Sequence, residues 1–338
     1  MKKELIQKRT DIELLRVISM IAVIVIHVVG NTLETFGLSN KTAITVYTII
    51  KQLMFFALPI FFMLSGMLFL NNKKNISIKE MLKKYCLRIL IVTLIVGFFF
   101  CCLEIIFTTK TFCFSDLFKA FINVVEGKSW SHMWYLYTIL GFYLITPFLK
   151  TFVDNATKND LKYILSILFV FSIIIPTINS VSGLTIAFTI PIISSFLFYY
   201  LYAHYIDKYS FTSKYKIISI ILALISATLL IVQNLLKITL FPIEYGSLVI
   251  FLISNGIFVS LINKDIKQNR IITSLSECSF AIYLFHQFFI NIIYKFLKFN
   301  IIIKYPYVGL ILYTIGILMI TYFFSYILRK IKLVRKFI

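Results

Sequence analysis

The stretch from Asp11 to His27, DIELLRVISMIAVIVIH, decides the fold, because it is an apolar run that also contains an arginine and a histidine. Arg16 and His27 are eleven positions apart. A helix would place them about 20° apart in azimuth and about 16 Å apart along its axis. Ionisable groups inside a bilayer are costly and usually face the bundle interior or a watery cavity. The stretch is therefore predicted to be a membrane helix with one functional face.

Arg16 also has a purely structural explanation. It lies near the start of the helix, where it could pair with Glu13 three residues earlier and extend its guanidinium to the membrane surface. His27 lies about fifteen residues into the predicted span, where neither surface is within reach. We therefore expect His27 to be functional, while both explanations stay open for Arg16.

The composition of the whole chain agrees with a membrane location. Its 338 residues are 60% hydrophobic with a mean hydropathy of +0.92, more than a soluble domain of this length could bury. Apolar runs of roughly the 20 residues that cross a bilayer recur along the chain. We expect an all-α, polytopic membrane protein with a single domain over residues 1–338. The ten predicted spans lie at about 12–31, 43–70, 87–108, 132–150, 161–179, 186–206, 216–233, 246–262, 278–298 and 306–328.

The net charge of +20 is explained by topology, so nucleic acid is not expected as a partner. With the N-terminus inside, 24 basic residues fall in cytoplasmic segments and eight in outer segments, and Arg16 and Lys51 lie within spans. This bias predicts that both termini are cytoplasmic and that the protein is a multi-pass protein of the cell membrane. The five cysteines and four histidines show no spacing typical of a metal site, so no metal is expected.

Two segments near the cytoplasmic side are candidates for binding an anion. The second span contains LPIFFMLSGMLF, where Ser65 and Gly66 either pack helices closely or let a ligand approach. Lys84 and Arg88 lie four residues apart at the start of the third span. An anionic ligand arriving from the cytoplasm would meet them together with Arg16. The alternative is that these charges face anionic lipid.

The outer side is predicted to carry an aromatic cluster. The connection 109–131 is the longest outer one and leads into GKSWSHMWYLY, which contains Trp130, His132 and Trp134. These residues form either an aromatic belt at the interface or a platform on which a sugar stacks. Glu104, near the outer end of the third span, is an isolated acid that could relay a proton, bind an acceptor hydroxyl or reach the interface.

The ninth span begins SLSECSFAIYLFH and contains the other deep histidine. Ser274 and Glu277 have the spacing of a capping box, which gives Glu277 a structural role. Tyr283 and His286 then fall on one helix face, with His286 near the middle of the membrane.

Taken in order, these segments resemble acyltransferase family 3, the integral membrane acyltransferases. The resemblance rests on Arg16 with ten intervening residues before His27, and on LPIFFMLSGMLF, HMWYLYTILGFYLITPFL and SFAIYLFH. It is closest to compact members that O-acetylate surface polysaccharides, such as the enterobacterial common antigen O-acetyltransferases. One position departs from the family pattern of two arginines three apart: Arg88 matches the second, and Tyr85 replaces the first. Lys84 could substitute, although it lacks the bidentate fork of arginine.

The resemblance implies about ten helices, cytoplasmic acetyl-CoA as a co-substrate without a tightly bound cofactor, and a cell-surface or lipid-linked glycan as the acceptor. In this interpretation His27 and Arg16 are catalytic, and His27 either takes the acceptor proton or carries the acyl group. The alternative function is export or flipping of a surface polysaccharide, which the same polar residues would serve. The donor residues would be Arg16, Lys84, Arg88, Ser65 and Gly66, and the acceptor side would include Trp130, His132, Trp134, Tyr283 and His286.

Overall fold

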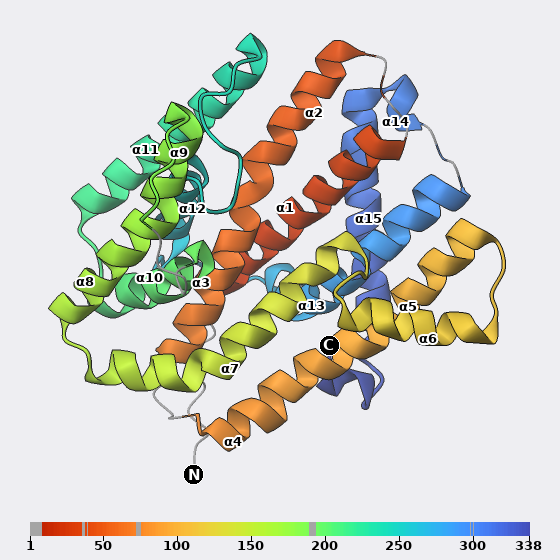
Figure 1. Ribbon diagram of the computed structural model, residues 1–338, viewed down its shortest axis with the longest axis horizontal. Coiled ribbons are helices and arrows are strands. Elements are labelled where there is room, and N and C mark those ends of the chain that lie inside the picture. The colour runs from red at the N-terminus through yellow and green to blue at the C-terminus, as the bar shows by residue number, and fades with distance from the viewer. Residues whose placement is uncertain are drawn as a thin grey trace. The chain divides into compact units, whose positions relative to one another are not determined.

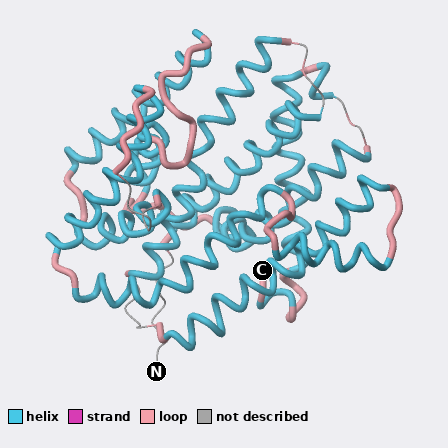
Figure 2. Tube along the Cα trace, in the orientation of Figure 1, coloured by secondary structure: helices cyan, strands magenta, loops and turns pink. Residues whose placement is uncertain are grey.

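The computed structural model describes residues 9–35, 38, 40–71, 76–188, 194–297, 299 and 301–338. Every regular element in this part of the chain is helical (Figures 1 and 2). Parts of the predicted spans 186–206 and 278–298 lie outside the described residues. The chain divides into two compact units: unit 1 is Met1–Asn71 with Ala156–Ser325, and unit 2 is Asn72–Asn155 with Tyr326–Ile338.

Unit 1 contains most of the helices. Its elements are α1 (Thr10–Thr35), α2 (Lys41–Leu53), η1 (Met54–Phe56), α3 (Ala57–Leu70), α8 (Lys158–Phe169), η4 (Val170–Ile174), α9 (Ile175–Ser182), α10 (Ser195–Tyr209), α11 (Ser213–Leu236), α12 (Leu248–Leu261), α13 (Arg270–Asn291), η5 (Ile292–Phe296), α14 (Ile301–Lys304) and most of α15 (Pro306–Leu328).

Unit 2 is built around a long helix that begins with a π-helical segment. Its elements are α4 (Ile78–Glu80), η2 (Met81–Cys86), α5 (Leu87–Thr109), α6 (Phe114–Val125), η3 (Ser131–Met133), α7 (Trp134–Asn155) and η6 (Val334–Lys336).

Seven helical segments of the described chain are long and apolar enough to cross a membrane, and they coincide with seven of the predicted spans. Predicted spans six, eight and nine correspond to α10, α12 and α13, of which α12 is apolar but only 14 residues long. The count of ten spans stays a prediction. The seven segments are Thr10–Glu34, Lys41–Leu70, Ile78–Thr109, Ser131–Asn155, Lys158–Ser182, Ser213–Leu236 and Pro306–Leu328.

The core of unit 1 lies where α1 meets α13 and α15. Met20 and Ile24 of α1 pack in one buried cluster with Ile282 of α13 and Ile317 of α15. Burying one such side chain contributes about 1.5–3 kcal/mol where the alternative is water. Within a bilayer, close van der Waals packing takes over this role. This packing fixes the rotation of α1 about its own axis, and the rotation decides which way the polar residues of α1 face.

The second span is interrupted where its sequence contains a proline. Pro59 lies in the first turn of α3 and has no N–H to bond to the carbonyl of Phe55. The chain tightens there into the 3₁₀ segment η1, between α2 and α3. Further along, a Cβ placed on Gly66 would lie 2.0 Å from the carbonyl oxygen of Tyr200, so α3 and α10 meet backbone to backbone. Gly66 therefore packs helices, which is the first of the two explanations given above.

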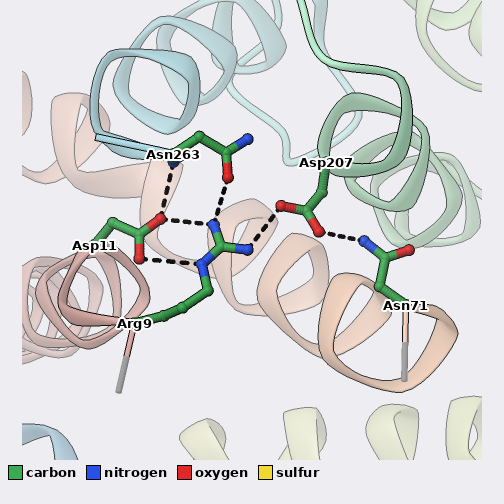
Figure 3. Close-up of polar contacts among 5 residues, drawn as sticks. All are labelled: Arg9, Asp11, Asn71, Asp207 and Asn263. Carbon is green, nitrogen blue, oxygen red and sulfur yellow. Dashed lines mark hydrogen bonds and ion pairs between the residues drawn. The ribbon is translucent and has the colours of Figure 1, made fainter. Parts of the chain in front are cut away.

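One end of unit 1 is joined by a cluster of polar side chains around Arg9 (Figure 3). The guanidinium of Arg9 donates to both carboxylate oxygens of Asp11, to Asp207 at 2.8 Å and to the side-chain oxygen of Asn263 at 2.8 Å. Asn71, which follows α3, donates to the other oxygen of Asp207. Asp11 also accepts from the backbone N–H of Asn263 at 2.8 Å. The cluster thus joins the start of α1 to the ends of α3, α10 and α12.

The connection 109–131 has a structure of its own. It contains the helix α6, whose buried Ala120 and Val124 pack against α5 while Phe114 is 89% exposed.

One local prediction, the capping box, is wrong. The capping box at Ser274 and Glu277 does not form, because α13 already begins at Arg270. Its N-cap is Asn269, which accepts from the N–H groups of residues 271 and 272. Ser274 instead lies inside the helix and shares a hydrogen bond with the hydroxyl of Tyr322 at 2.7 Å.

Candidate active site

The polar residues of α1 pair with those of α13 along most of the interface between the two helices. Residue numbers increase together in both helices, so α1 and α13 run in the same direction. This agrees with two spans that both leave from the same side of the membrane. The hydrogen-bonded pairs are Glu13 with Thr273 at 2.7 Å, Arg16 with Ser276 at 3.1 Å, Asn31 with Gln287 at 3.2 Å, and Thr32 with Tyr294 of η5 at 2.8 Å.

Two histidines meet toward the end of this interface that carries Asn31 and Thr32. The ring centroids of His27 and His286 are 4.9 Å apart, with the ring planes inclined by 54°. His286 is fully buried, and its Nδ1 lies 2.6 Å from the carbonyl oxygen of Tyr283. A proton on Nδ1 would be donated to that carbonyl, leaving Nε2 as the basic nitrogen. The Tyr283 ring is 5.9 Å from the ring of His286. Three residues predicted as site members are thus brought together.

Sequence reasoning missed an amide pair that joins α1 and α13 close to the two histidines in sequence. The side chains of Asn31 and Gln287 exchange hydrogen bonds at 3.2 and 3.4 Å, and Asn31 also donates to the backbone carbonyl of His27 at 2.8 Å. Asn31 is one turn beyond His27, and Gln287 directly follows His286. A polar residue one turn from an intramembrane histidine was a usable signal. The pair holds α1 and α13 at a fixed spacing beside the rings.

Lys51 is the third residue whose place in the site sequence reasoning missed. It lies within the second span, near the end of α2, and its side chain crosses to α1. A Cβ placed on Gly30 would be 3.5 Å from Nζ of Lys51, and Gly30 is three residues beyond His27. The absence of a side chain at Gly30 gives the ammonium room on α1. A cation therefore lies within one helical turn of the histidine pair.

Arg16 marks the other end of the same interface. Its Nη1 donates to Oγ of Ser276 at 3.1 Å, and the side chain is half-buried. Arg16 precedes His27 by eleven residues and Ser276 precedes His286 by ten, which is about 15–16 Å along either helix. The interface thus has a guanidinium at one end and two imidazoles at the other.

The basic residues predicted at the third span lie in unit 2. Nε of Arg88 donates to the carbonyl oxygen of Phe337 at 2.9 Å, and Arg329 is close enough to interact with it electrostatically. Arg329 therefore supplies a second arginine in the neighbourhood of Arg88. Lys84 instead forms an exposed ion pair with Glu80 at 3.3 Å, a kind of pair that contributes little. Because Arg16 belongs to unit 1, its shared role with Arg88 stays a prediction.

The aromatic residues that were predicted on the outer side belong to unit 2 and are packed. Trp130 is 8% exposed, and its ring stacks on Phe100 with centroids 4.2 Å apart. Its indole N–H donates to Glu104 at 2.9 Å, so Glu104 holds Trp130 in place. His132 is 2% exposed, and its ring also lies beside Phe100 at 5.7 Å. This arrangement is a buried aromatic cluster, whereas the sequence prediction was an open platform or a belt. The ring of Trp134 lies edge-on to Tyr135.

Comparison with known proteins gives a match to one family model. The family model of acyltransferase family 3, described as an acyltransferase domain, matches residues 9–330. No curated protein and no solved structure matches the chain in the corresponding comparisons. The match extends from Arg9 through both histidines into the last long helix. With its long apolar helices, the chain is a multi-pass membrane acyltransferase that belongs to acyltransferase family 3.

Proposed function

We propose that the protein is a membrane O-acetyltransferase that moves an acetyl group from cytoplasmic acetyl-CoA to a hydroxyl of a cell-surface or lipid-linked glycan. The observation that carries this proposal is the pair of imidazoles, His27 and His286, on the α1–α13 interface that has Arg16 at its other end. The proposed place of action is the cell membrane, with both termini in the cytoplasm, as the distribution of basic residues predicts.

In the proposed reaction the donor approaches from the Arg16 end. The guanidinium binds a phosphate of CoA, and the extended pantetheine arm follows the interface toward the imidazoles. Phosphates bind arginine through charge-assisted hydrogen bonds. The hydrogen bond from Nη1 to Ser276 orients the Arg16 side chain for this contact. The thioester then reaches the level of His27, about 16 Å further along α1.

The chemical step needs a base for the acceptor hydroxyl. A ring nitrogen of His27 takes the proton while the hydroxyl oxygen bonds to the thioester carbon. The carbon–sulfur bond breaks, and CoA leaves as a thiolate that receives the proton from His27. Negative charge develops on the carbonyl oxygen during the step. The ammonium of Lys51, one turn from His27, is suited to stabilise that charge.

The proposal is tested by mass spectrometry of surface glycans from cells that carry the wild-type gene, no gene, or the His27→Gln variant. O-acetylated glycan is expected only with the wild-type gene. Acetyl transfer from labelled acetyl-CoA by the purified protein in proteoliposomes supplies the matching in vitro measurement. Equal acetylation in all three strains, together with less glycan at the surface without the gene, would point to an exporter and reject the proposal.

A further inference from the structure

A pocket of about 550 Å³ lies in unit 1, away from the histidine pair. Its walls come from η1, from η4 and α9, from the first turn of α10 and from the segment that leads into α12. Pockets that bind small ligands have volumes of about 300–1,000 Å³. The volume is therefore sufficient for one or two sugar-sized rings. Neither histidine of the pair and no residue predicted from the sequence as a site member lies among its described lining residues.

The lengths of α10 and α12 place this pocket below the membrane surface. The two helices have 15 and 14 residues, which is about 22 and 21 Å, whereas the apolar core of a bilayer is about 30 Å thick. One end of each helix is fixed by the Arg9 cluster, through Asp207 and Asn263. The missing length is therefore at the other end, where the pocket lies. Non-helical backbone at membrane depth is tolerated where it lines a watery cavity.

Three half-buried aromatic rings form one side of the pocket. The ring centroid of Tyr245 lies 5.2 Å from that of Phe55 at an interplanar angle of 32°, and 6.1 Å from that of Phe196 at 44°. Aromatic faces favour ligands that present C–H groups on a flat face and polar groups at the edge. A sugar ring has this character, because its hydroxyls project around a C–H face.

The remaining described lining mixes apolar residues, such as Pro176, Pro242 and Ile243, with hydroxyl residues and a single acid, Glu244. Glu244 lines the pocket, is exposed, and forms no ion pair with any residue that the structure describes. Ser180 and Ser195 also line the pocket, and no described lining residue is basic. A phosphate of CoA would be repelled by the carboxylate. A neutral polyol would use it as a strong hydrogen-bond acceptor.

The segments around the pocket are held in place by hydrogen bonds that leave the lining rings accessible. Tyr199, in the first turns of α10, donates its hydroxyl to the carbonyl of Tyr245 at 2.7 Å. Thr177 of α9 accepts from the N–H of Leu248 at 3.1 Å. A Cβ placed on Gly246 would lie 3.2 Å from both the carbonyl oxygen of Ser172 and Oγ of Ser195. The pocket is therefore preformed, which lowers the entropic cost of binding.

The pocket shares a wall with the helices that carry the candidate active site. Phe55 belongs to η1, and η1 packs against both α1 and α12. Lys51, four residues earlier in the same span, reaches α1 beside Gly30. Lys51 and Phe55 are four residues apart and so lie on similar faces of this span, about one helical turn from each other.

From these observations we infer that the pocket binds the acceptor as a neutral saccharide, with one sugar ring stacked on Tyr245 and a hydroxyl donated to Glu244. This inference rests on the proposed function, since it names the binding site of the same acceptor. It assigns the acceptor to the end of unit 1 opposite the Arg9 cluster, while the donor enters beside Arg16.

The test measures binding of methyl glucoside, methyl galactoside and methyl N-acetylglucosaminide by saturation-transfer NMR, with the protein in nanodiscs free of glycosidic detergent. At least one glycoside is expected to bind the wild-type protein. Ser180→Trp, which fills the pocket from an exposed position, should weaken that binding at least tenfold, and Glu244→Gln should weaken it severalfold. Ser182→Trp, on the same helix outside the pocket, and Glu126→Gln are the matched controls and should bind as wild type.

Binding of no glycoside, equal binding by Ser180→Trp and Ser182→Trp, or equally strong binding of cyclohexylmethanol would overturn the inference. Acetyl-CoA-dependent acetylation of glycan by the same samples separates this result from the proposed function. If acetylation persists without glycoside binding, the pocket assignment is wrong and the proposed function stands. If glycosides bind in the pocket and no acetyl group is transferred, the proposed function is wrong and the saccharide site stands.

Discussion

The imidazole rings of His27 and His286 lie 4.9 Å apart, although one belongs to the first long helix and the other to α13. Both are deep in the predicted spans, and each is followed by a member of the Asn31–Gln287 amide pair. A protonated and a neutral imidazole at this separation can share or pass on a proton, whereas two charged rings would repel each other. The pair therefore has the character of a base with a supporting partner.

Replacing His27 by glutamine is expected to lower the rate of acetyl transfer at least about 100-fold, because a general base typically supplies a factor of about 10²–10⁴. Glutamine keeps a hydrogen-bonding side chain but cannot take a proton near neutral pH. His286→Gln should cost less, since it removes the partner and leaves the base. The rate is measured in proteoliposomes, after size-exclusion chromatography has shown that each variant folds. A larger loss for His286→Gln than for His27→Gln would assign the base to α13.

Replacing Arg16 by alanine is expected to raise the KM for acetyl-CoA about ten- to a hundredfold, because charge-assisted hydrogen bonds to phosphate contribute about 1.5–3 kcal/mol. Arg88→Ala is expected to act in the same direction. Ser276→Ala, which removes only the hydrogen-bond partner of Arg16, should have a smaller effect. Direct binding of acetyl-CoA to the detergent-solubilised variants checks this. Wild-type affinity in Arg16→Ala would leave Arg16 as a structural residue of the α1–α13 interface.

The polar face of α1 could be predicted from the periodicity of its sequence alone. The eleven-residue spacing places Arg16 and His27 on one helix face, and the structure has both on the side that meets α13. The identity of the partner helix could not be predicted, because it depends on packing between segments far apart in sequence. Met20 and Ile282, which set that packing, look like any other apolar residues of a membrane span.

The capping-box prediction was wrong because a second local signal, an N-cap residue earlier in the sequence, outweighed it. Ser274 and Glu277 have the spacing of a capping box, but Asn269 caps α13 earlier, and the helix continues through both residues. The sequence placed Lys51 within a span but indicated no role for it. Its role depends on the contact between its ammonium and α1 at Gly30, which only the structure shows. The pocket depends on four separate segments and on the shortness of α10 and α12, so no single stretch of sequence indicates it.

Replacing Lys51 by methionine is expected to lower kcat about 100-fold with little change in the KM for acetyl-CoA. Methionine keeps a flexible apolar side chain and removes the ammonium beside α1, and loss of one group that stabilises a developing oxyanion costs about 10²–10³ in kcat. Lys51→Arg should retain part of the activity. Lys41→Met, at the exposed start of the same helix, is the control. Unchanged turnover in Lys51→Met would make Lys51 an anchor of α2 on α1.

The direction of the chain through the membrane is tested by labelling single cysteines. In a background that carries Cys113→Ser, a cysteine at Asn123 in α6 should react with a membrane-impermeant maleimide added outside cells. A cysteine at Asn155, at the end of α7, should react only after the membrane is permeabilised. Both positions lie in unit 2 and are separated by one predicted span. The reverse pattern would place both termini outside and exchange the donor and acceptor sides.

The Arg9 cluster makes a prediction about stability. Arg9→Ala leaves the carboxylates of Asp11 and Asp207, which are 5% and 14% exposed, without their shared cation. Breaking a buried ion pair costs about 3–5 kcal/mol, but Arg9 itself is 37% exposed, so solvent screening reduces the expected loss to about 2 kcal/mol. The melting temperature of Arg9→Ala in detergent should fall accordingly. Arg9→Lys should keep only part of the lost stability, because lysine cannot bridge two carboxylates with a planar fork.

A second substitution separates the charge from the packing of Arg9. Asp207→Asn removes one of the two carboxylates. The new side-chain amide can still accept the hydrogen bond from Asn71 when its oxygen faces that residue. If charge dominates, Arg9→Ala combined with Asp207→Asn should melt at a higher temperature than Arg9→Ala alone. If lost packing of the arginine stem dominates, the double variant should melt at or below the temperature of Arg9→Ala. A wild-type melting temperature for Arg9→Ala would mean that the ends of α3, α10 and α12 are held to α1 by apolar contacts alone.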